Sequence, residues 1–412
     1  MQLLAKRDIV VGIDIGSTKV VALVGEIKSE EAVSVIGFGE CTSSGLRKGN
    51  IVDIDNVAKA IEEAVAKAEQ MSGTEIEYAY VGITGSNIAS LNNKGVVAVA
   101  SGDNEISERD VDRVIQASKV ISIPPDRKII HVLPREFIVD GYNGIMDPVG
   151  MAGSRLEVEA HIVTGASTTI QNLLKTVERS GIKVAQLVLS SLASSQAVLL
   201  PAEKELGAVL VDIGGGTTEI AIYDQGSLCF TSVLPMGGDY ITSDIAVGLR
   251  TPIANAEQIK KEAGCVLSEL VSEADTIEVC GVSGRDTRVV SKKELAKIIE
   301  PRAQEILQIV KREIQRSGYK GLLPGGVVLT GGTALLDGMV EMTGEVLELP
   351  VRAGVPDQIG GVSDIVKNTA YSTGVGLLLY GSNNESCQRS DEKDSSFNHM
   401  FDKVKHWFRD FF

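Results

Sequence analysis

The feature that most constrains this chain is a strand, glycine turn, strand unit that occurs twice. In the first copy the apolar run 9–15 leads into the turn at 16–19, and a second apolar run follows. In the second copy the run 208–213 leads into a glycine-rich turn at 214–218. The tripeptide Asp-Ile-Gly starts at position 14 and again at position 212, so the copies are 212 − 14 = 198 residues apart, nearly half the chain. Apolar runs of this length before glycine turns are typical of buried strands. The spacing therefore predicts two related α/β halves and not a short-repeat solenoid.

Both turns carry the groups that a phosphate needs. Glycine lets backbone N–H groups close on phosphate oxygens, hydroxyls donate further hydrogen bonds, and Lys19 supplies a cation. Asp14 and Asp212 stand at the strand ends, where two carboxylates can hold Mg²⁺ through its waters or orient an attacking water. Taken singly, each turn is more often a simple tight hairpin, but the duplicated placement favours phosphate binding. The expected phosphate-binding residues are Asp14, Gly16, Ser17, Thr18, Lys19, Asp212, Gly214, Gly215, Gly216, Thr217 and Thr218.

Two further segments are candidates for the nucleoside end of the same ligand. Gly331, Gly332 and Thr333 follow the apolar run 327–330 and carry no charge, which suits the close approach of a flat group such as adenine. Glu257, Lys260 and Lys261 are three and four residues apart on an expected helix, and hence on one face. This face would contact ribose hydroxyls, although a solvated helix surface explains it equally well.

Residues 85–162 interrupt the first half and are expected to form an inserted small α/β module. His131 and His161 lie in expected strands of this module, without an acidic or cysteine cluster at metal spacing, so we expect structural histidines. After the second glycine turn and its hairpin, helices are expected as far as Arg316, with a kink or break at Pro301.

Charge and cysteine content exclude some classes of function. The net charge of −15 argues against a nucleic-acid-binding protein, because phosphate binding needs a basic field. The 5 Cys include no CxxC pair, so neither a disulfide framework nor a zinc ribbon is expected. We see no apolar run of the ~18 residues that a membrane span needs, and no signal-like start.

The end of the chain has a different composition. Residues 381–396 are almost entirely polar and predict a disordered linker. At 100° per residue, the apolar side chains of residues 397–412 fall within an arc of about 140°, and the polar ones lie outside it. Such segregation predicts a helix lying on a membrane surface, and the polar linker argues against the alternative of docking on the protein's own core. Its apolar face is Phe397, Met400, Phe401, Val404, Trp407, Phe408, Phe411 and Phe412.

These motifs resemble those of the actin/Hsp70/sugar-kinase superfamily. IVVGIDIGSTKV and LVDIGGGTTEIAIY resemble its two phosphate loops, and VVLTGGTALLDGM resembles its adenosine motif. QLVLSSLASSQAVL and AYSTGVGLLLYG resemble its two connecting helices. Within the superfamily the sequence is most similar to the FtsA family of bacterial cell-division proteins, because of LRKGNIVDI, the insert, NLLKTVERSGIKV and the Phe/Trp-rich end.

The resemblance implies an α/β fold of the actin-like ATPase type, with two duplicated halves around a nucleotide cleft, an inserted small α/β subdomain and a C-terminal amphipathic helix. The expected parts are subdomain 1A at 1–84 and 163–203, 1C at 85–162, 2A at 204–236 and 317–380, 2B at 237–316, the linker at 381–396 and the membrane helix at 397–412.

The resemblance also implies a function and its partners. These are ATP with Mg²⁺ (held by Asp14 and Asp212 through water), self-assembly into protofilaments, and docking of the C-terminal peptide of the tubulin-like protein FtsZ on subdomain 2B. Arg302 and Lys293 match the basic positions of that docking surface. Later division proteins would be recruited through 1C, on the cytoplasmic side of the cell membrane at the division site.

Alternatives of the same fold remain open at the level of sequence. A small-molecule kinase, a pilus-assembly adaptor and a filament protein that shapes the cell wall all share the phosphate motifs. The aromatic tail favours the division protein, since a cytosolic kinase has no use for it. No residue is identified as a general base, so the chain is expected to be at most a slow or regulatory ATPase.

Overall fold

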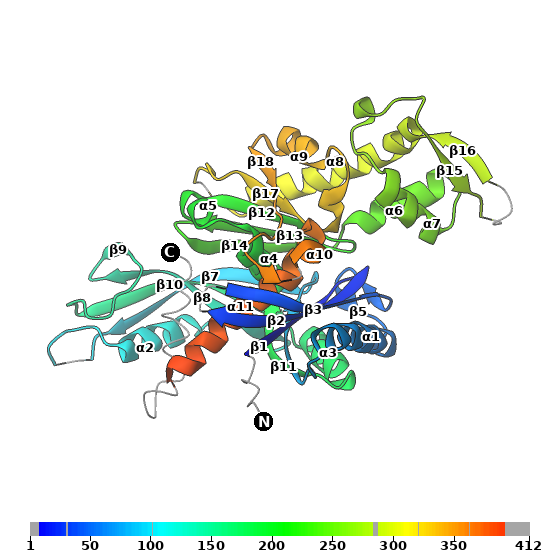
Figure 1. The fold of residues 1–412 in the computed structure, drawn as a ribbon. Helices are drawn as coiled ribbons and strands as arrows, with labels where there is room; N and C mark the ends of the chain where they lie inside the picture. Colours follow the sequence, from blue (N-terminus) through cyan, green and yellow to red (C-terminus); the bar gives the residue numbers. More distant parts are fainter. Residues whose placement is uncertain are drawn as a thin grey trace, which may run out of the picture.

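The two halves of the chain are built on mixed β-sheets that share an order of five strands, and β19 adds a sixth strand to the first sheet (Figure 1). The computed structural model describes residues 8–29, 32–100, 102–282, 287–319, 321–361 and 363–391. The first sheet has the order β11 (Lys183–Leu189), β6 (Tyr78–Ile83), β1 (Ile9–Ile15), β2 (Lys19–Ser29), β3 (Ala32–Thr42), β19 (Gly360–Gly361). The second has the order β18 (Val351–Ala353), β17 (Val327–Thr330), β12 (Ala208–Ile213), β13 (Thr218–Asp224), β14 (Ser227–Leu234).

The central strands of the two sheets occupy equivalent places. β1 pairs antiparallel with β2 and parallel with β6, and β12 pairs antiparallel with β13 and parallel with β17. Each glycine turn follows its central strand directly. This repeated topology confirms the duplicated α/β halves that the spacing predicts.

Helices with clear local signals cover the first sheet. In α1 (Ile54–Ser72), the Asp53 carboxylate caps the start by accepting a hydrogen bond from the Asn56 N–H at 3.1 Å, and Gly73 ends the helix with a φ of 69°. Its apolar face packs on β2 and β3, and α3 (Ser167–Arg179) lies beside it. A short hairpin of β4 (Leu46–Arg47) and β5 (Asn50–Ile51) precedes α1.

Two helices join the halves. α11 (Ser372–Asp391) covers β1, β2 and β6, while α4 (Ser190–Val198) contacts β12 and β13. The two helices pack so closely that a Cβ on Gly376 would lie 1.8 Å from the Ala193 carbonyl oxygen. The short α5 (Pro201–Leu206) follows α4 and leads into the second half.

The prediction of a disordered linker from residue 381 is wrong for residues 381–391, because α11 continues to Asp391. The polar side chains at this point bond within the helix: the Ser382 hydroxyl donates to the Leu379 carbonyl and the Asn384 amide to the Tyr380 carbonyl, both at 2.9 Å. Gly381 packs tightly beside Val10 and Tyr80. The rest of the predicted linker, 392–396, and the predicted membrane helix lie outside the described residues.

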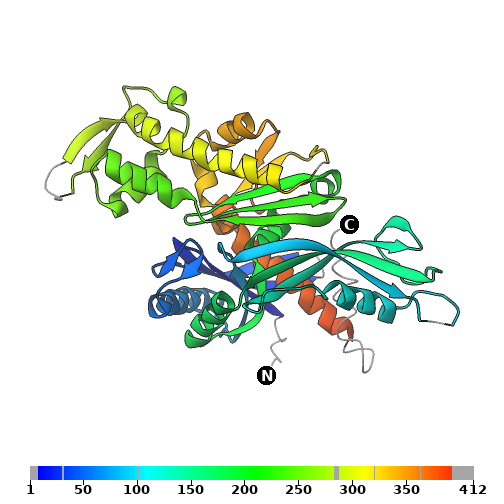
Figure 2. The same ribbon diagram turned by 180° about the vertical axis from the view of Figure 1, so that it is seen from behind.

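The insert forms an antiparallel sheet (Figure 2). It has a small hydrophobic core of its own. Its order is β7 (Ile88–Ala98), β10 (Arg155–Ala166), β8 (Arg127–Val139), β9 (Tyr142–Ile145), and α2 (Glu108–Ser118) covers one face. β7 was not expected, because much of this strand is polar and exposed. A capping box between Ser107 and Asp110 starts α2, as its sequence indicates.

Both histidines of the insert are buried at its borders with hydrogen-bond partners, as expected for structural histidines. His161 lies between the Asn92 side chain (2.7 Å) and the Thr231 hydroxyl (3.1 Å) of β14. His131 accepts a hydrogen bond from the Leu189 N–H at 3.0 Å. Burial lowers the pKa of His131 to about 4 and that of His161 to about 3, so both rings are neutral near pH 7.

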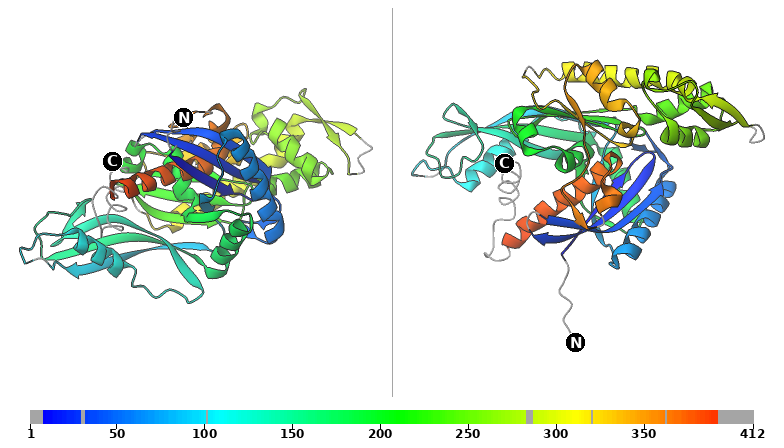
Figure 3. Two further views of the ribbon diagram at one scale, coloured as in Figure 1. Left: turned by 60° about the horizontal axis from the view of Figure 1, so that its bottom comes forward. Right: turned by 45° about the horizontal axis from the view of Figure 1, so that its top comes forward.

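The insert and a second lobe project from opposite ends of the molecule (Figure 3). The second lobe contains α6 (Gly238–Gly248), α7 (Ile253–Ala263), η1 (Ser268–Leu270), β15 (Thr276–Cys280), β16 (Thr287–Ser291) and α8 (Lys292–Arg316). The expected run of helices is therefore interrupted by the β15–β16 hairpin. Of the kink or break expected at Pro301, the break is wrong, since α8 is one continuous helix. Its buried side chains, including Ile299 and Ala303, hold both sides of the proline on the same core.

Candidate nucleotide-binding site

A cavity of about 370 Å³ lies between the two halves. This volume is typical of a small-molecule site. The cavity brings together all but one of the residues expected to bind a nucleotide. Those that line it are Asp14, Gly16, Ser17, Thr18, Lys19, Asp212, Gly214, Gly215, Gly216, Thr217, Glu257, Lys260, Lys261, Gly331, Gly332 and Thr333.

Thr218 is the exception. It starts β13 with no exposed surface, and its hydroxyl donates to the Met236 carbonyl at 2.8 Å. Thr218 therefore supports the second glycine turn from behind and does not face the cavity, so its expected role as a ligand-binding residue is not supported by the structure.

The two glycine turns face each other at contact distance. A Cβ on Gly215 would lie 1.9 Å from the Thr18 hydroxyl, and one on Gly216 would lie 2.4 Å from the Ser17 hydroxyl. Only glycine therefore fits in the second turn, whose backbone approaches the hydroxyls of the first. An arrangement of backbone and small hydroxyls from two sides suits the oxygens of a polyphosphate.

Asp14 and Asp212 both line the cavity, as expected from their places at the strand ends. Burial, and then the charge of Asp212, raise the pKa of Asp14 to about 6, while Lys19 opposes the rise. Burial also raises the pKa of Asp212, whose Oδ2 accepts a hydrogen bond from the Ser194 hydroxyl at 2.7 Å. A cation near these two carboxylates would relieve the cost of ionising them.

Magnesium fits this pair only with help from other ligands. Among the residues that the structure describes, no three His, Cys, Asp or Glu side chains converge closely enough to hold a metal by themselves. Mg²⁺ usually binds through one or two carboxylates, water and the phosphates of its substrate. Asp14 and Asp212 match this pattern.

Glu219 is a buried cavity carboxylate, close enough to Asp14 and Asp212 to feel their charge, that the sequence reasoning missed. It stands on β13 and is 5 % exposed. Its Oε2 and the nearby Thr84 hydroxyl have no hydrogen-bond partner among the described residues. Burial, and then the charge of Asp212, raise the pKa of Glu219 to about 8. A charged residue within the otherwise apolar run EIAIY was the signal that could have indicated it.

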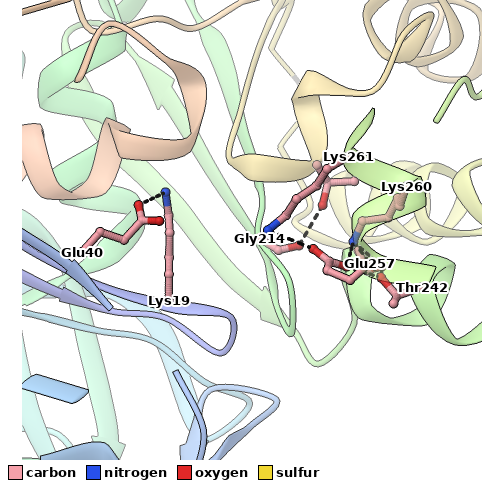
Figure 4. Close-up of polar contacts among 9 residues, drawn as sticks. Lys19, Glu40, Gly214, Thr242, Glu257, Lys260 and Lys261 are labelled. Atoms are coloured by element: carbon pink, nitrogen blue, oxygen red, sulfur yellow. Dashed lines mark hydrogen bonds and ion pairs between the residues drawn. The ribbon is translucent and has the colours of Figure 1, made fainter. Parts of the chain in front are cut away.

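The residues expected to meet the nucleoside line the cavity from the second half of the chain. The Thr333 hydroxyl donates to the Gly214 carbonyl at 3.0 Å, which ties the third glycine turn to the second. Glu257, Lys260 and Lys261 stand across the cavity from Lys19 (Figure 4).

The three charged residues of α7 differ in their surroundings. The Lys260 ammonium is buried against the Glu257 carboxylate (2.6 Å) and the Thr242 hydroxyl (2.8 Å), so the solvated-surface interpretation is wrong for Lys260. It fits Lys261, which is mostly exposed and 3.5 Å from Glu257. Burial opposes ionisation of Glu257, but Lys260 and the Thr242 hydroxyl hold its pKa below the usual value. Lys260 fixes α7 to α6, and Glu257 and Lys261 remain the groups able to meet a ribose.

Replacing Glu219 with Gln is expected to stabilise the fold at alkaline pH. The pKa of about 8 in the folded protein lies above the ordinary carboxyl pKa of 4.5, so the wild type loses stability as the pH rises from 4.5 through 8. The neutral Gln side chain escapes this loss. The thermal midpoint of Glu219→Gln should exceed that of the wild type at pH 8, and the difference should close at pH 5. A difference that is independent of pH would show that Glu219 is ionised in the folded protein.

Two duplicated halves, two connecting helices and glycine turns facing one cavity define an actin-like ATPase fold. Solved structures agree: the PilM-PilN type IV pilus biogenesis complex contains a similar chain (TM-score 0.68, 15 % identity, covering 92 % of this chain and 99 % of that one). MreB5 of Spiroplasma citri, solved bound to ADP, is also similar (TM-score 0.56, 12 % identity, covering 94 % and 99 %).

Sequence comparison identifies the family. The family model for "Cell division protein FtsA" matches residues 209–376, and the model for the "SHS2 domain inserted in FTSA" matches residues 85–164. The cell division protein FtsA of Pseudomonas aeruginosa is 45 % identical over 377 residues, which are 92 % of this chain and 90 % of that protein. The chain belongs to the FtsA family of cell division proteins, and the resemblance seen in the motifs is confirmed.

Proposed function

We propose that this chain is an ATP-dependent adaptor that polymerises on the inner face of the cell membrane and attaches FtsZ to it at the division site. The observation that carries the nucleotide part is the contact between the two glycine turns across the cavity, with Lys19 and two carboxylates beside them. ATP with Mg²⁺ fits this donor set, and the similarity to MreB5 bound to ADP supports a nucleotide. The proposed ATPase activity is at most slow or regulatory.

Membrane attachment is proposed from the sequence pattern of residues 397–412. Within the described part of the chain, no helix combines the length and the apolar character that a bilayer span requires. Surface attachment by this amphipathic segment is the proposed mode, and polymerisation would strengthen it by multivalency. The insert is the proposed contact for later division proteins.

Arg302, on the proposed FtsZ docking surface, already has acidic neighbours. Its guanidinium bonds both carboxylate oxygens of Asp244 on α6 (2.5 and 3.2 Å) and also bonds Glu305, and it lies over the Tyr240 ring. Lys293 lies 3.7 Å from Glu273. An acidic peptide docking on α8 would therefore compete with Asp244 for Arg302. An Arg302→Glu substitution would place three carboxylates together, so a neutral variant gives the cleaner test.

Arg302→Gln is expected to weaken binding of the FtsZ C-terminal peptide by about 10- to 150-fold, the usual range for a hydrogen bond to a charged group. Anisotropy titration of a labelled peptide measures the change, and the thermal midpoint checks the fold. Asp244→Asn is the matched control: it removes the Asp244 charge and keeps the Arg302 guanidinium, with Glu305 as its remaining ion-pair partner, so the peptide should bind at least as tightly as to the wild type. Unchanged affinity in Arg302→Gln would place the docking surface elsewhere.

A further inference from the structure

Lys19, the cation of the first glycine turn, has two partners inside the cavity. Its ammonium lies 3.5 Å from Oε2 of Glu40 (Figure 4) and 3.6 Å from the centre of the Tyr371 ring. Glu40 reaches it from β3, diagonally across the β2–β3 ladder in which Val21 pairs with Glu40 and Lys19 with Thr42. A phosphate oxygen that binds Lys19 either shares the ammonium with this carboxylate, against the repulsion of the two negative charges, or displaces it.

Glu40 and Tyr371 are also bonded to each other. The Tyr371 hydroxyl donates to the same Glu40 Oε2 at 2.9 Å, and the Phe38 ring packs edge-on against Tyr371. Burial, and then the Glu40 charge, raise the pKa of Tyr371 to about 12, so the hydroxyl keeps its proton and remains a donor. Glu40 thus keeps a hydrogen bond when Lys19 turns away from it.

The segment that carries Tyr371 is fixed to the nucleoside end of the cavity. Tyr371 ends the short helix η3 (Thr369–Tyr371), just before α11. The Thr369 carbonyl accepts a hydrogen bond from the Gly331 N–H (3.1 Å), and the Thr369 hydroxyl donates to the Gly331 carbonyl (3.0 Å). The position of the ring beside Lys19 is therefore set by the turn expected to meet adenine.

We propose that Glu40 and Tyr371 are positioning residues that set how readily Lys19 reaches the terminal phosphate of the bound nucleotide. Glu40 holds Lys19 and weakens phosphate binding, while the Tyr371 hydroxyl holds Glu40 and makes the exchange of partners easier. The proposal rests on the proposed binding of ATP. It gives Glu40 and Tyr371, two further residues of the cavity, a role in setting the affinity for ATP.

The proposal predicts that substitutions of Glu40 and Tyr371 change the affinity for ATP in opposite directions. Glu40→Gln removes the competing charge, and because the pair is partly exposed, ATP should bind about 2- to 5-fold more tightly. Tyr371→Phe keeps the ring but frees Glu40 to hold Lys19, and ATP should bind about 2- to 5-fold more weakly. If Tyr371 acts through Glu40, the Tyr371→Phe effect should vanish in the Glu40→Gln background.

The test is a titration of a fluorescent ATP analogue, with Mg²⁺, against the wild type, both single variants and the double variant. Matched controls are Glu348→Gln, which breaks the exposed Glu348–Lys311 pair outside the cavity, and Tyr142→Phe on the exposed β9. Thermal midpoints verify folding, and either single variant decides the proposal if the other fails to fold. Three results would overturn the proposal. They are unchanged or weaker ATP binding by Glu40→Gln, stronger ATP binding by Tyr371→Phe, and a Tyr371→Phe effect that is equal in both backgrounds. Failure of the wild type to bind the analogue would refute the proposed function itself.

Discussion

Lys19→Ala is expected to bind ATP about 10- to 150-fold more weakly than the wild type. A hydrogen bond from a charged donor contributes ~1.5–3 kcal/mol, and Lys19 is the cation in the first glycine turn. Burial lowers the pKa of Lys19, but Glu40 and Asp14 oppose this, which favours a charged ammonium beside the carboxylates. Titration of a fluorescent ATP analogue with Mg²⁺ measures the loss.

The control for this variant is Lys59→Ala, which removes the same charge from the exposed side of α1. Lys59→Ala should bind the analogue as tightly as the wild type. Equal affinities for the wild type and Lys19→Ala would show that Lys19 does not bind the phosphate. The two glycine turns would then be the remaining evidence for a phosphate site.

Replacing Trp407 and Phe408 together by Glu is expected to abolish binding to lipid vesicles. Full burial of one large apolar side chain contributes about 1.5–3 kcal/mol, so losing two weakens binding by at least about 100-fold. The basic residues of the segment attract anionic lipid only modestly, because Asp402 and Asp410 offset part of their charge. Sedimentation with anionic vesicles measures the effect, and ATP binding should be unchanged.

A control for the tail places the same two charges on its opposite face. His399 and His406 lie opposite the centre of the apolar arc when the sequence is drawn as a helix. The variant with His399→Glu and His406→Glu should still sediment with vesicles, more weakly than the wild type. If the Trp407/Phe408 variant sediments as well as the wild type, the tail does not anchor the protein.

The phosphate-binding part of the cavity could be predicted from the sequence because its signals are local. A strand, an Asp and a glycine turn stand next to each other in the chain, and the second copy made chance an unlikely explanation. The structure brings these residues together from both halves, as expected. Thr218 differs because side chains of a strand alternate between its faces, and its hydroxyl points away from the cavity.

The residues that modulate the site could not be found in this way. Glu40, Glu219 and Tyr371 reach the cavity from β3, β13 and η3, and their proximity depends on strand pairing and on the packing of α11. β7 and the β15–β16 hairpin were also missed, because both are short of buried apolar residues and gain their partners only in the tertiary fold. The extension of α11 beyond residue 380 depends on packing against β1 and β6 that composition does not reveal.

The most direct test of the central claim, that one chain links FtsZ to a membrane, uses a labelled FtsZ C-terminal peptide and anionic vesicles in the presence of ATP and Mg²⁺. After sedimentation, the peptide should be found with the vesicles only when the full chain is present, and it should remain in solution with the Trp407/Phe408 or Arg302→Gln variant. A full chain that sediments with the vesicles while the peptide stays in solution would contradict the account.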